Sequence, residues 1–150
     1  MKPIFFVLLF CSLLLLSFSC KKSSSNKPGY AETIVGSWEL RQTSAAMNPT
    51  VGTFAPGNGN IIKFTPTEYE IYNGAQLVKK GQYTIVPDPT VESSVCLLFP
   101  VGQFTNRIIY DGDTTSNKTF LQITNNRMAF VAGCYAVDAG HRAEYEKVEG

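Results

Sequence analysis

Glu68-Tyr69-Glu70-Ile71-Tyr72-Asn73-Gly74 alternates polar and apolar side chains and then ends in a turn dipeptide. The alternation predicts a half-buried β-strand with Tyr69 and Ile71 on one face, because successive side chains of a strand point to opposite faces. Asn-Gly favours the positive backbone angles of the tight turns that join antiparallel neighbours. The segment therefore predicts one strand of a β-hairpin together with its turn.

The same pattern recurs along the chain from residue 33 onward, where helical periodicity is hard to find. Turn signals such as Pro87-Asp88-Pro89 and Asn125-Asn126 separate the alternating segments. Short links of this kind join antiparallel strands, whereas parallel strands need long crossover connections. The predicted strands are Val35–Thr43, Ile61–Thr65, Glu68–Tyr72, Gly81–Val86, Val95–Phe99, Arg107–Tyr110, Thr119–Thr124, Met128–Cys134 and a last strand near Arg142–Val148.

Eight or nine short antiparallel strands in one chain of 150 residues predict a single all-β domain. Closing such a meander into a barrel removes its exposed edges. We therefore expect one antiparallel up-and-down β-barrel of about eight strands over residues 33–150. The longest candidate loop, Ala45–Asn60, is rich in Gly, Pro, Asn and Thr, and it is either a lid over one end of the barrel or a segment without fixed structure.

The first twenty residues predict an export signal. The apolar run Ile4–Leu16 has thirteen residues, whereas a bilayer-spanning helix needs about 20, and it follows a short positive start. Ser19-Cys20 and the polar stretch behind it resemble the processing site of bacterial lipoproteins. That resemblance implies a signal peptide at 1–19, a lipid on Cys20 and a flexible tether over 20–32. Secretion without a lipid is the alternative.

The lipid implies a membrane as the first partner, because acyl chains on one cysteine hold a protein on a bilayer. No acidic residue follows Cys20 closely, whereas some tethers of surface-exported lipoproteins are acid-rich. We therefore expect a bacterial cell-envelope protein that is anchored to the outer membrane and faces the periplasm.

Val35-Gly36-Ser37-Trp38-Glu39-Leu40 resembles the Gly-x-Trp motif that opens the first strand of lipocalins. The later segments 61–64, 68–74, 80–85 and 143–148 resemble the hairpins and last strand of bacterial lipocalin-like lipoprotein domains. The resemblance implies a small antiparallel barrel that Trp38 closes at one end. A basic residue of a late strand often covers this Trp in lipocalins; Arg142 is the first candidate here and Arg127 the second.

An eight-strand barrel is either filled by its own side chains or able to hold one small ligand. We predict non-covalent binding of a small, mainly apolar ligand, with Trp38 as a core residue that also forms the floor of the pocket. The alternative is a filled barrel that acts as a protein-binding, inhibitory or structural module of the envelope. The candidate ligand-lining residues are Trp38, Tyr69, Ile71, Tyr83, Ile85, Leu97, Phe99 and Phe130.

Charge and residue types exclude several other functions. Lys2 is the one charged residue before Cys20, so the remaining chain carries 12 basic and 12 acidic residues, without the basic surplus typical of nucleic-acid binders. His141 is the single histidine, and no nucleophile or phosphate-binding loop accompanies it. We therefore expect no enzyme, cofactor or metal site. Cys96 and Cys134 are either a disulfide, as export favours, or two separate buried thiols.

Overall fold

The computed structural model describes residues 34–47 and 51–149. The predicted signal peptide, the lipidation site Cys20 and the tether 20–32 lie outside these residues. No helix within the described ranges has the length and apolar character to cross a membrane. The elements are β1 (Gly36–Ala45), β2 (Gly52–Thr53), β3 (Ile61–Phe64), β4 (Glu68–Asn73), β5 (Gln76–Pro87), α3 (Val91–Val95), β6 (Asn106–Tyr110), β7 (Thr119–Thr124), β8 (Arg127–Ala132), the 3-10 helix η1 (Tyr135–Val137) and β9 (His141–Val148).

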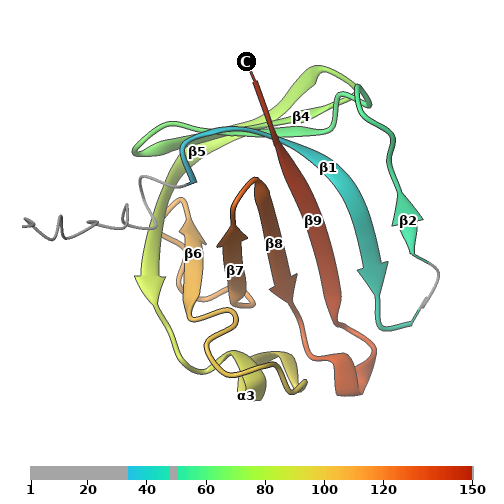
Figure 1. The fold of residues 1–150 in the computed structure, drawn as a ribbon. Coiled ribbons are helices and arrows are strands. Elements are labelled where there is room, and N and C mark those ends of the chain that lie inside the picture. The colour runs from blue at the N-terminus through green and yellow to red at the C-terminus, as the bar shows by residue number, and fades with distance from the viewer. Residues whose placement is uncertain (1–33, 48–50, 150) are drawn as a thin grey trace, which may run out of the picture.

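Eight of the strands form a closed antiparallel barrel (Figure 1). Each strand from β3 to β9 pairs with the next, and β1 closes the ring by pairing with both β3 and β9. The ninth strand, β2, is an addition of two residues beside the second half of β1. The prediction of an all-β chain with one up-and-down barrel is confirmed.

The β4–β5 hairpin forms where the sequence predicts it. Gly74 and Ala75 occupy its turn with φ angles of 54° and 66°, and these positive values match the twist of the flanking strands. Strand β5 starts at Gln76, directly after the turn, and is longer than the predicted segment Gly81–Val86. The first half of β5 pairs with β4, and its second half pairs with β6.

Two apolar clusters hold the fold together, one inside the barrel and one outside. Alternate residues of the strands face inward and build the first cluster, whose members range from Trp38 in β1 to Phe130 in β8. The intervening residues of β7 and β8 face outward and pack against α3 and the chain that follows it. Strand β8 is therefore covered on both faces, as its five buried residues in succession indicate.

The prediction of a strand at Val95–Phe99 is wrong. Val95 is the last residue of α3, and Cys96, with a φ of 56°, ends that helix in the left-handed conformation. The segment is apolar because Val95 and Phe99 cover the outer face of the barrel, whereas Leu97 is 42% exposed. The doubly covered strand that this apolar run suggested is β8.

Candidate functional site

Trp38 is a core residue at one end of the barrel interior. The side chain is fully buried, and its Nε1 donates a hydrogen bond to the carbonyl oxygen of Ile34 at 2.6 Å. Lys147 covers the ring, with Nζ 5.3 Å from the ring centroid. A basic residue of the last strand thus lies over this tryptophan.

The prediction that Arg142 covers Trp38 is wrong. Lys147 is the residue of β9 that pairs with Trp38, whereas Arg142 pairs with Ser44 near the far end of β1. The Arg142 guanidinium lies instead over the Phe104 ring, 5.6 Å from its centroid, on the outside of the barrel. Arg127, the second candidate, is an exposed residue that lines hollows on the outer surface.

The structure brings most of the predicted ligand-lining residues together and separates two of them. Leu97 and Phe99 lie outside the barrel, and Phe99 stacks edge-on against Phe104 at 5.0 Å between ring centroids. Both follow α3 instead of belonging to a barrel strand. The remaining candidates belong to the interior cluster: Trp38, Tyr69, Ile71, Tyr83, Ile85 and Phe130.

Two interior tyrosines, Tyr110 and Tyr145, were missing from the sequence-based set. Tyr110 of β6 pairs with Tyr83 and lies edge-on to Tyr69 at 4.7 Å between ring centroids. Tyr145 of β9 lies edge-on to Phe130 at 5.8 Å. Tyr110 shares the inward face of β6 with Ile108, but Ile109 between them is apolar too, so the alternation of side chains does not mark this face.

The four interior tyrosine hydroxyls fall into two groups. The Tyr69 hydroxyl donates to Asp111 Oδ2 at 2.9 Å, and the Tyr83 hydroxyl donates to the carbonyl oxygen of Thr65 at 2.7 Å. No hydrogen bond of the Tyr110 or Tyr145 hydroxyl is found within residues 34–47 and 51–149, but neither hydroxyl is a fully buried atom without a partner, because Arg107 Nε is the one such atom in these ranges.

Tyr110 and Tyr145 lie deep among protein atoms, yet both keep part of their surface accessible. Burial raises the pKa of Tyr145 to about 12. Burial also raises the pKa of Tyr110 far above its ordinary value, and charge repulsion from Tyr145, Tyr69 and Tyr83 adds to this effect. Tyr145 also borders one of the hollows on the outer surface. The raised pKa values keep both phenols protonated at neutral pH.

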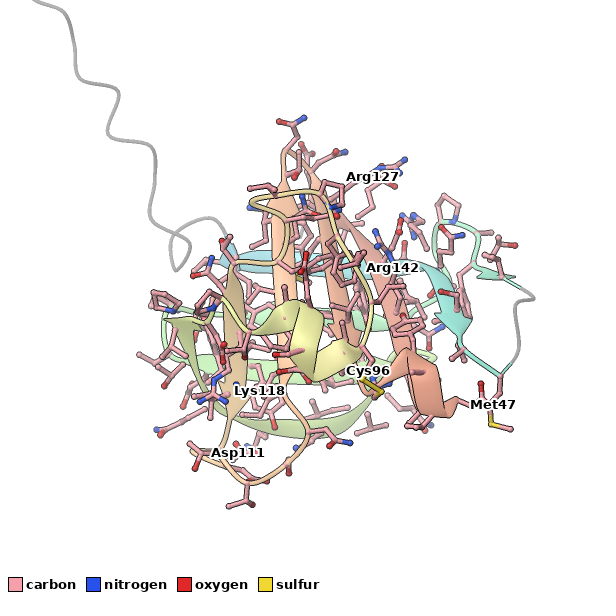
Figure 2. All side chains as sticks on the ribbon, turned by 90° about the horizontal axis from the view of Figure 1, so that it is seen from below. Met47, Cys96, Asp111, Lys118, Arg127 and Arg142 are labelled. Atoms are coloured by element: carbon pink, nitrogen blue, oxygen red, sulfur yellow. A yellow bond between two sulfur atoms is a disulfide. The ribbon has the colours of Figure 1, made fainter. Side chains whose placement is uncertain are left out.

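A second site candidate lies on the outer face of β1, β9, β8 and β7. Two hollows of about 230 Å³ each lie next to one another there, because both are lined by Arg127 and Glu144. Figure 2 shows Arg127 and Arg142 on this face. Arg142 pairs with Glu144 at 2.8 Å, whereas Arg127 has no ion pair among the residues that the structure describes. We call this surface the arginine trough.

The buried carboxylate of Glu39 fixes the chain that borders the arginine trough. Glu39 accepts hydrogen bonds from the backbone N–H groups of Gly57 and Gly59 at 3.0 and 3.1 Å, and from Arg41 at 2.6 Å. The Gly57 hydrogen bond is the main cause that lowers the pKa of Glu39, against the opposing effect of burial. The described part of the loop Ala45–Asn60 therefore follows the outer face of β1.

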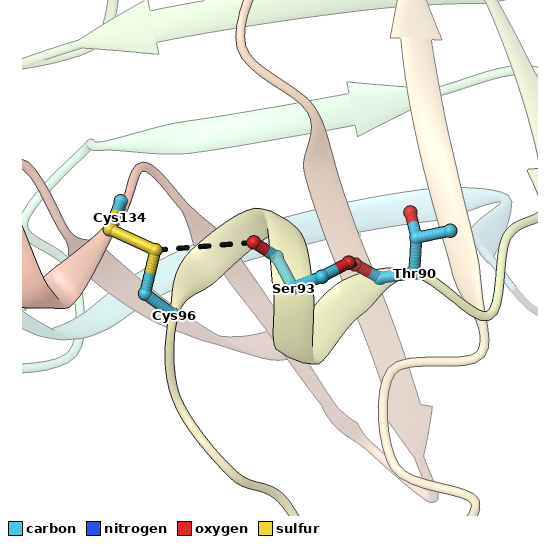
Figure 3. Close-up of a disulfide and its surroundings, with 4 residues drawn as sticks. All are labelled: Thr90, Ser93, Cys96 and Cys134. Atoms are coloured by element: carbon cyan, nitrogen blue, oxygen red, sulfur yellow. Dashed lines mark hydrogen bonds between the residues drawn. A yellow bond between two sulfur atoms is a disulfide. The ribbon is translucent and has the colours of Figure 1, made fainter.

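Cys96 and Cys134 form a disulfide, with their sulfur atoms 2.06 Å apart (Figure 3). The bond joins the end of α3 to the chain that leaves β8. Asp88 holds the chain just before α3. Its carboxylate accepts hydrogen bonds from the backbone N–H and the hydroxyl of Thr90 and forms an ion pair with Lys118 at 3.0 Å. Helix α3, which packs on the outer apolar cluster, is thus held at both of its ends.

The described ranges contain no cluster of three or more of the side chains that bind metal ions. The Asp113 carboxylate accepts hydrogen bonds from Thr115 and Ser116 of its own turn. Comparison of the chain with protein-family models and with curated proteins gave no match.

Proposed function

We propose that this protein is a membrane-anchored envelope lipoprotein whose lipocalin-like barrel binds a small, mainly apolar ligand without a covalent bond. The observation that carries the proposal is the incomplete burial of inward-facing side chains, since a fully packed interior leaves them no accessible surface. An eight-strand barrel is wide enough for one small ligand. The inward-facing apolar residues that stay partly accessible are Ile71, Ile85, Tyr110 and Ile123, and Tyr145, which also borders an outer hollow.

The lipocalin-like part of the proposal rests on the end of the barrel around Trp38. The closed antiparallel topology, the buried tryptophan in the first strand and the basic Lys147 over its ring are the features that the sequence resemblance implies. These features support a common architecture, and the ligand itself has to be found by experiment.

Binding is testable with the single tryptophan of the chain as a reporter. We expect N-phenyl-1-naphthylamine, a neutral apolar fluorophore, to bind the purified barrel saturably and to accept excitation energy from Trp38. The variant Ile85→Phe fills the interior and should abolish the signal. Thr84→Phe adds the same side chain at an exposed neighbouring position and should preserve it. No saturable binding to the wild-type barrel, or equal binding to both variants, would refute an interior site.

The membrane anchor is tested separately with Cys20→Ala in the full chain. Each acyl methylene that enters a bilayer contributes about 0.8 kcal/mol, so loss of the lipid should release the protein from the membrane. We expect the wild-type chain in the outer-membrane fraction of a bacterial host and the variant outside it. Cys11→Ala, within the predicted signal, is the matched control and should leave the wild-type distribution unchanged.

The arginine trough favours a second function, the binding of a protein partner that presents an acidic group. Arg127 is exposed and lacks an ion pair within the described chain, and guanidinium groups bind carboxylates in a bidentate manner. Cross-linking in the native envelope tests this function. An adduct that forms with wild-type protein and is lost with Arg127→Glu, but not with Lys80→Glu, supports it.

A further inference from the structure

Resting on the proposed membrane anchor, we infer that the loop after α3 inserts its apolar tip into the surface of the bilayer that holds the lipid. We call residues 97–101 the apolar loop. Leu98 and Val101 of this loop are 83% and 107% exposed. Among the large apolar side chains that the structure describes, these two are the most exposed. The apolar loop therefore displays the kind of side chain that enters a membrane interface.

The apolar loop lies in a stretch of sequence without charge. Residues 93–106 contain no Asp, Glu, Lys or Arg, although 17% of the whole chain is charged. Leu and Val favour the bilayer interior, whereas charged side chains oppose entry. The carboxylates near the loop belong to its base: Glu92 accepts a hydrogen bond from the N–H of the half-buried Phe99 at 3.4 Å, and Asp138 follows η1. Apolar burial is therefore the driving force, and anionic lipids are not required.

The apolar loop is fixed on the barrel at both of its ends. The disulfide of Cys96 holds its start, and Phe99 and Phe104 pack in the outer apolar cluster. After the tip, Gln103 Nε2 donates a hydrogen bond to Gln122 Oε1 of β7 at 2.9 Å. A loop that is already ordered loses little conformational entropy when its tip is buried. The exposed apolar side chains are therefore presented in a form that is ready to insert.

The backbone at the tip of the apolar loop meets part of its own demand for hydrogen bonds. The N–H of Gln103 donates to the carbonyl oxygen of Pro100 at 3.0 Å and closes a turn around Val101 and Gly102. Gly102 has a φ of 83°, which the second central residue of such a turn requires. Pro100 has no N–H group, so it has no donor to lose from water. Unpaired backbone groups are costly in lipid, and this turn lowers that cost at the most exposed residue.

The chain between the lipid and the barrel is long enough to let this face meet the bilayer. Ile34 lies at the start of β1, whereas α3 and η1 lie where β1 ends, since Ala45 pairs with His141 just after η1 (Figure 1). The ten residues of β1 span about 33 Å. Fourteen residue steps separate Cys20 from Ile34, and such a chain reaches about 48 Å at most. An anchor within this reach keeps the loop at high local concentration near the membrane, so a weak apolar contact is sufficient.

The shape of this face favours a lipid surface over a protein partner. Val101 projects from its turn, and Val137 of η1 is 70% exposed on the segment that the disulfide joins to the apolar loop (Figure 3). Protein interfaces match each projecting side chain with a complementary surface. A fluid bilayer adapts to separate apolar tips without a preformed pocket. The bilayer that already holds the anchor is therefore the occupant that we infer.

The experiment places a tryptophan at the tip and asks whether lipid reaches it. The full lipidated chain is reconstituted into vesicles of phosphatidylcholine whose acyl chains are either ordinary or dibrominated, since bromine quenches indole fluorescence at short range. Val101→Trp reports on the apolar loop. Val78→Trp is the matched control, because Val78 is 58% exposed in the first half of β5, the half that pairs with β4 and not with β6. Wild type gives the background of the fully buried Trp38.

We expect Val101→Trp to lose emission in the brominated vesicles, and Val78→Trp and wild type to emit equally in both kinds. Adding Leu98→Asp to Val101→Trp should remove the loss, because a charge opposes entry into lipid. Adding Leu77→Asp, at another exposed position of β5, should preserve it. No loss at position 101, or an equal loss at position 78, would overturn the inference while the proposed anchor stands. A wild-type chain that does not float with the vesicles would overturn the anchor and the inference together.

Discussion

Lys147 Nζ lies 5.3 Å from the centroid of the Trp38 ring, and the two residues are direct partners across β9 and β1. Trp38 is fully buried, so the lysine stem forms part of the cover over this end of the barrel. A cation over the face of an indole is attracted by the negative charge density of the ring. Lys147 thus contributes both packing and charge to the rim.

The variant Lys147→Met keeps an unbranched apolar stem and removes the charge. We expect the free energy of unfolding to fall by about 0.5–1 kcal/mol, the contribution of a cation–π contact near the surface. Urea unfolding monitored by Trp38 fluorescence measures the change directly. Lys80→Met, at an exposed position in β5, is the control and should leave stability unchanged. A Lys147→Met protein as stable as this control would show that the cation adds nothing.

The sequence resemblance implied the type of residue over Trp38 but not its identity. The choice of Arg142 placed the start of β9 opposite the start of β1. Antiparallel pairing instead sets Trp38, near the start of β1, opposite Lys147, near the end of β9, and sets Arg142 opposite Ser44. The β-bulge between Leu40 and Gln42 changes this register by one residue only.

The interior residues were predictable where alternation was strict and unpredictable where a segment was wholly apolar. Tyr69 and Ile71 alternate with Glu68 and Glu70, and both face inward in β4. The run Val95–Phe99 is apolar because it covers the outside of the barrel. Apolar composition alone does not distinguish a central strand from a covering segment, because both bury the same kinds of side chain.

Glu39 provides a test of the chain that borders the arginine trough. Glu39→Gln removes the charge that holds Arg41, Gly57 and Gly59, and charge-assisted hydrogen bonds contribute about 1.5–3 kcal/mol each. We expect a stability loss of about 1–3 kcal/mol and faster hydrogen exchange at the Gly57 and Gly59 amides. Glu146→Gln removes another partner of Arg41 without touching the glycines, so their exchange should stay slow. Unchanged exchange of these two amides in Glu39→Gln would show that the Glu39 carboxylate does not hold this part of the loop.

The disulfide should contribute strongly to stability, because it closes a loop with a sequence separation of 38. The chain-entropy model assigns about 4 kcal/mol to a loop of this length. We expect the Cys96→Ser, Cys134→Ser double variant to unfold at correspondingly lower urea concentration. Wild-type protein reduced with dithiothreitol should match the double variant. Equal midpoints for the oxidised and reduced proteins would mean that the cross-link does not constrain the unfolded chain.

Asp88 should make folding sensitive to acid, because its carboxylate is buried beside two basic groups. Lys118 Nζ lies 3.0 Å and Arg107 Nε 3.4 Å from Oδ2. Burial on its own raises the pKa, but the hydrogen bonds from Thr90 and Lys118 outweigh it and lower the pKa of Asp88 from 3.8 to about 2. A depressed pKa means that the ionised form stabilises the fold, so this contribution is complete above pH 3.8 and is lost as the pH falls through about 2.

The shift corresponds to about 2 kcal/mol, because one pKa unit is equivalent to about 1.4 kcal/mol. We expect Asp88→Asn to be less stable than wild type by about this amount at neutral pH, and the gap should close as the pH falls from 3.8 to about 2. Urea unfolding across this range measures both proteins. The hydrogen-bonded Asp113 also has a lowered pKa, but both proteins share it, so their difference isolates Asp88. A gap that stays constant with pH would assign the loss to packing instead of charge.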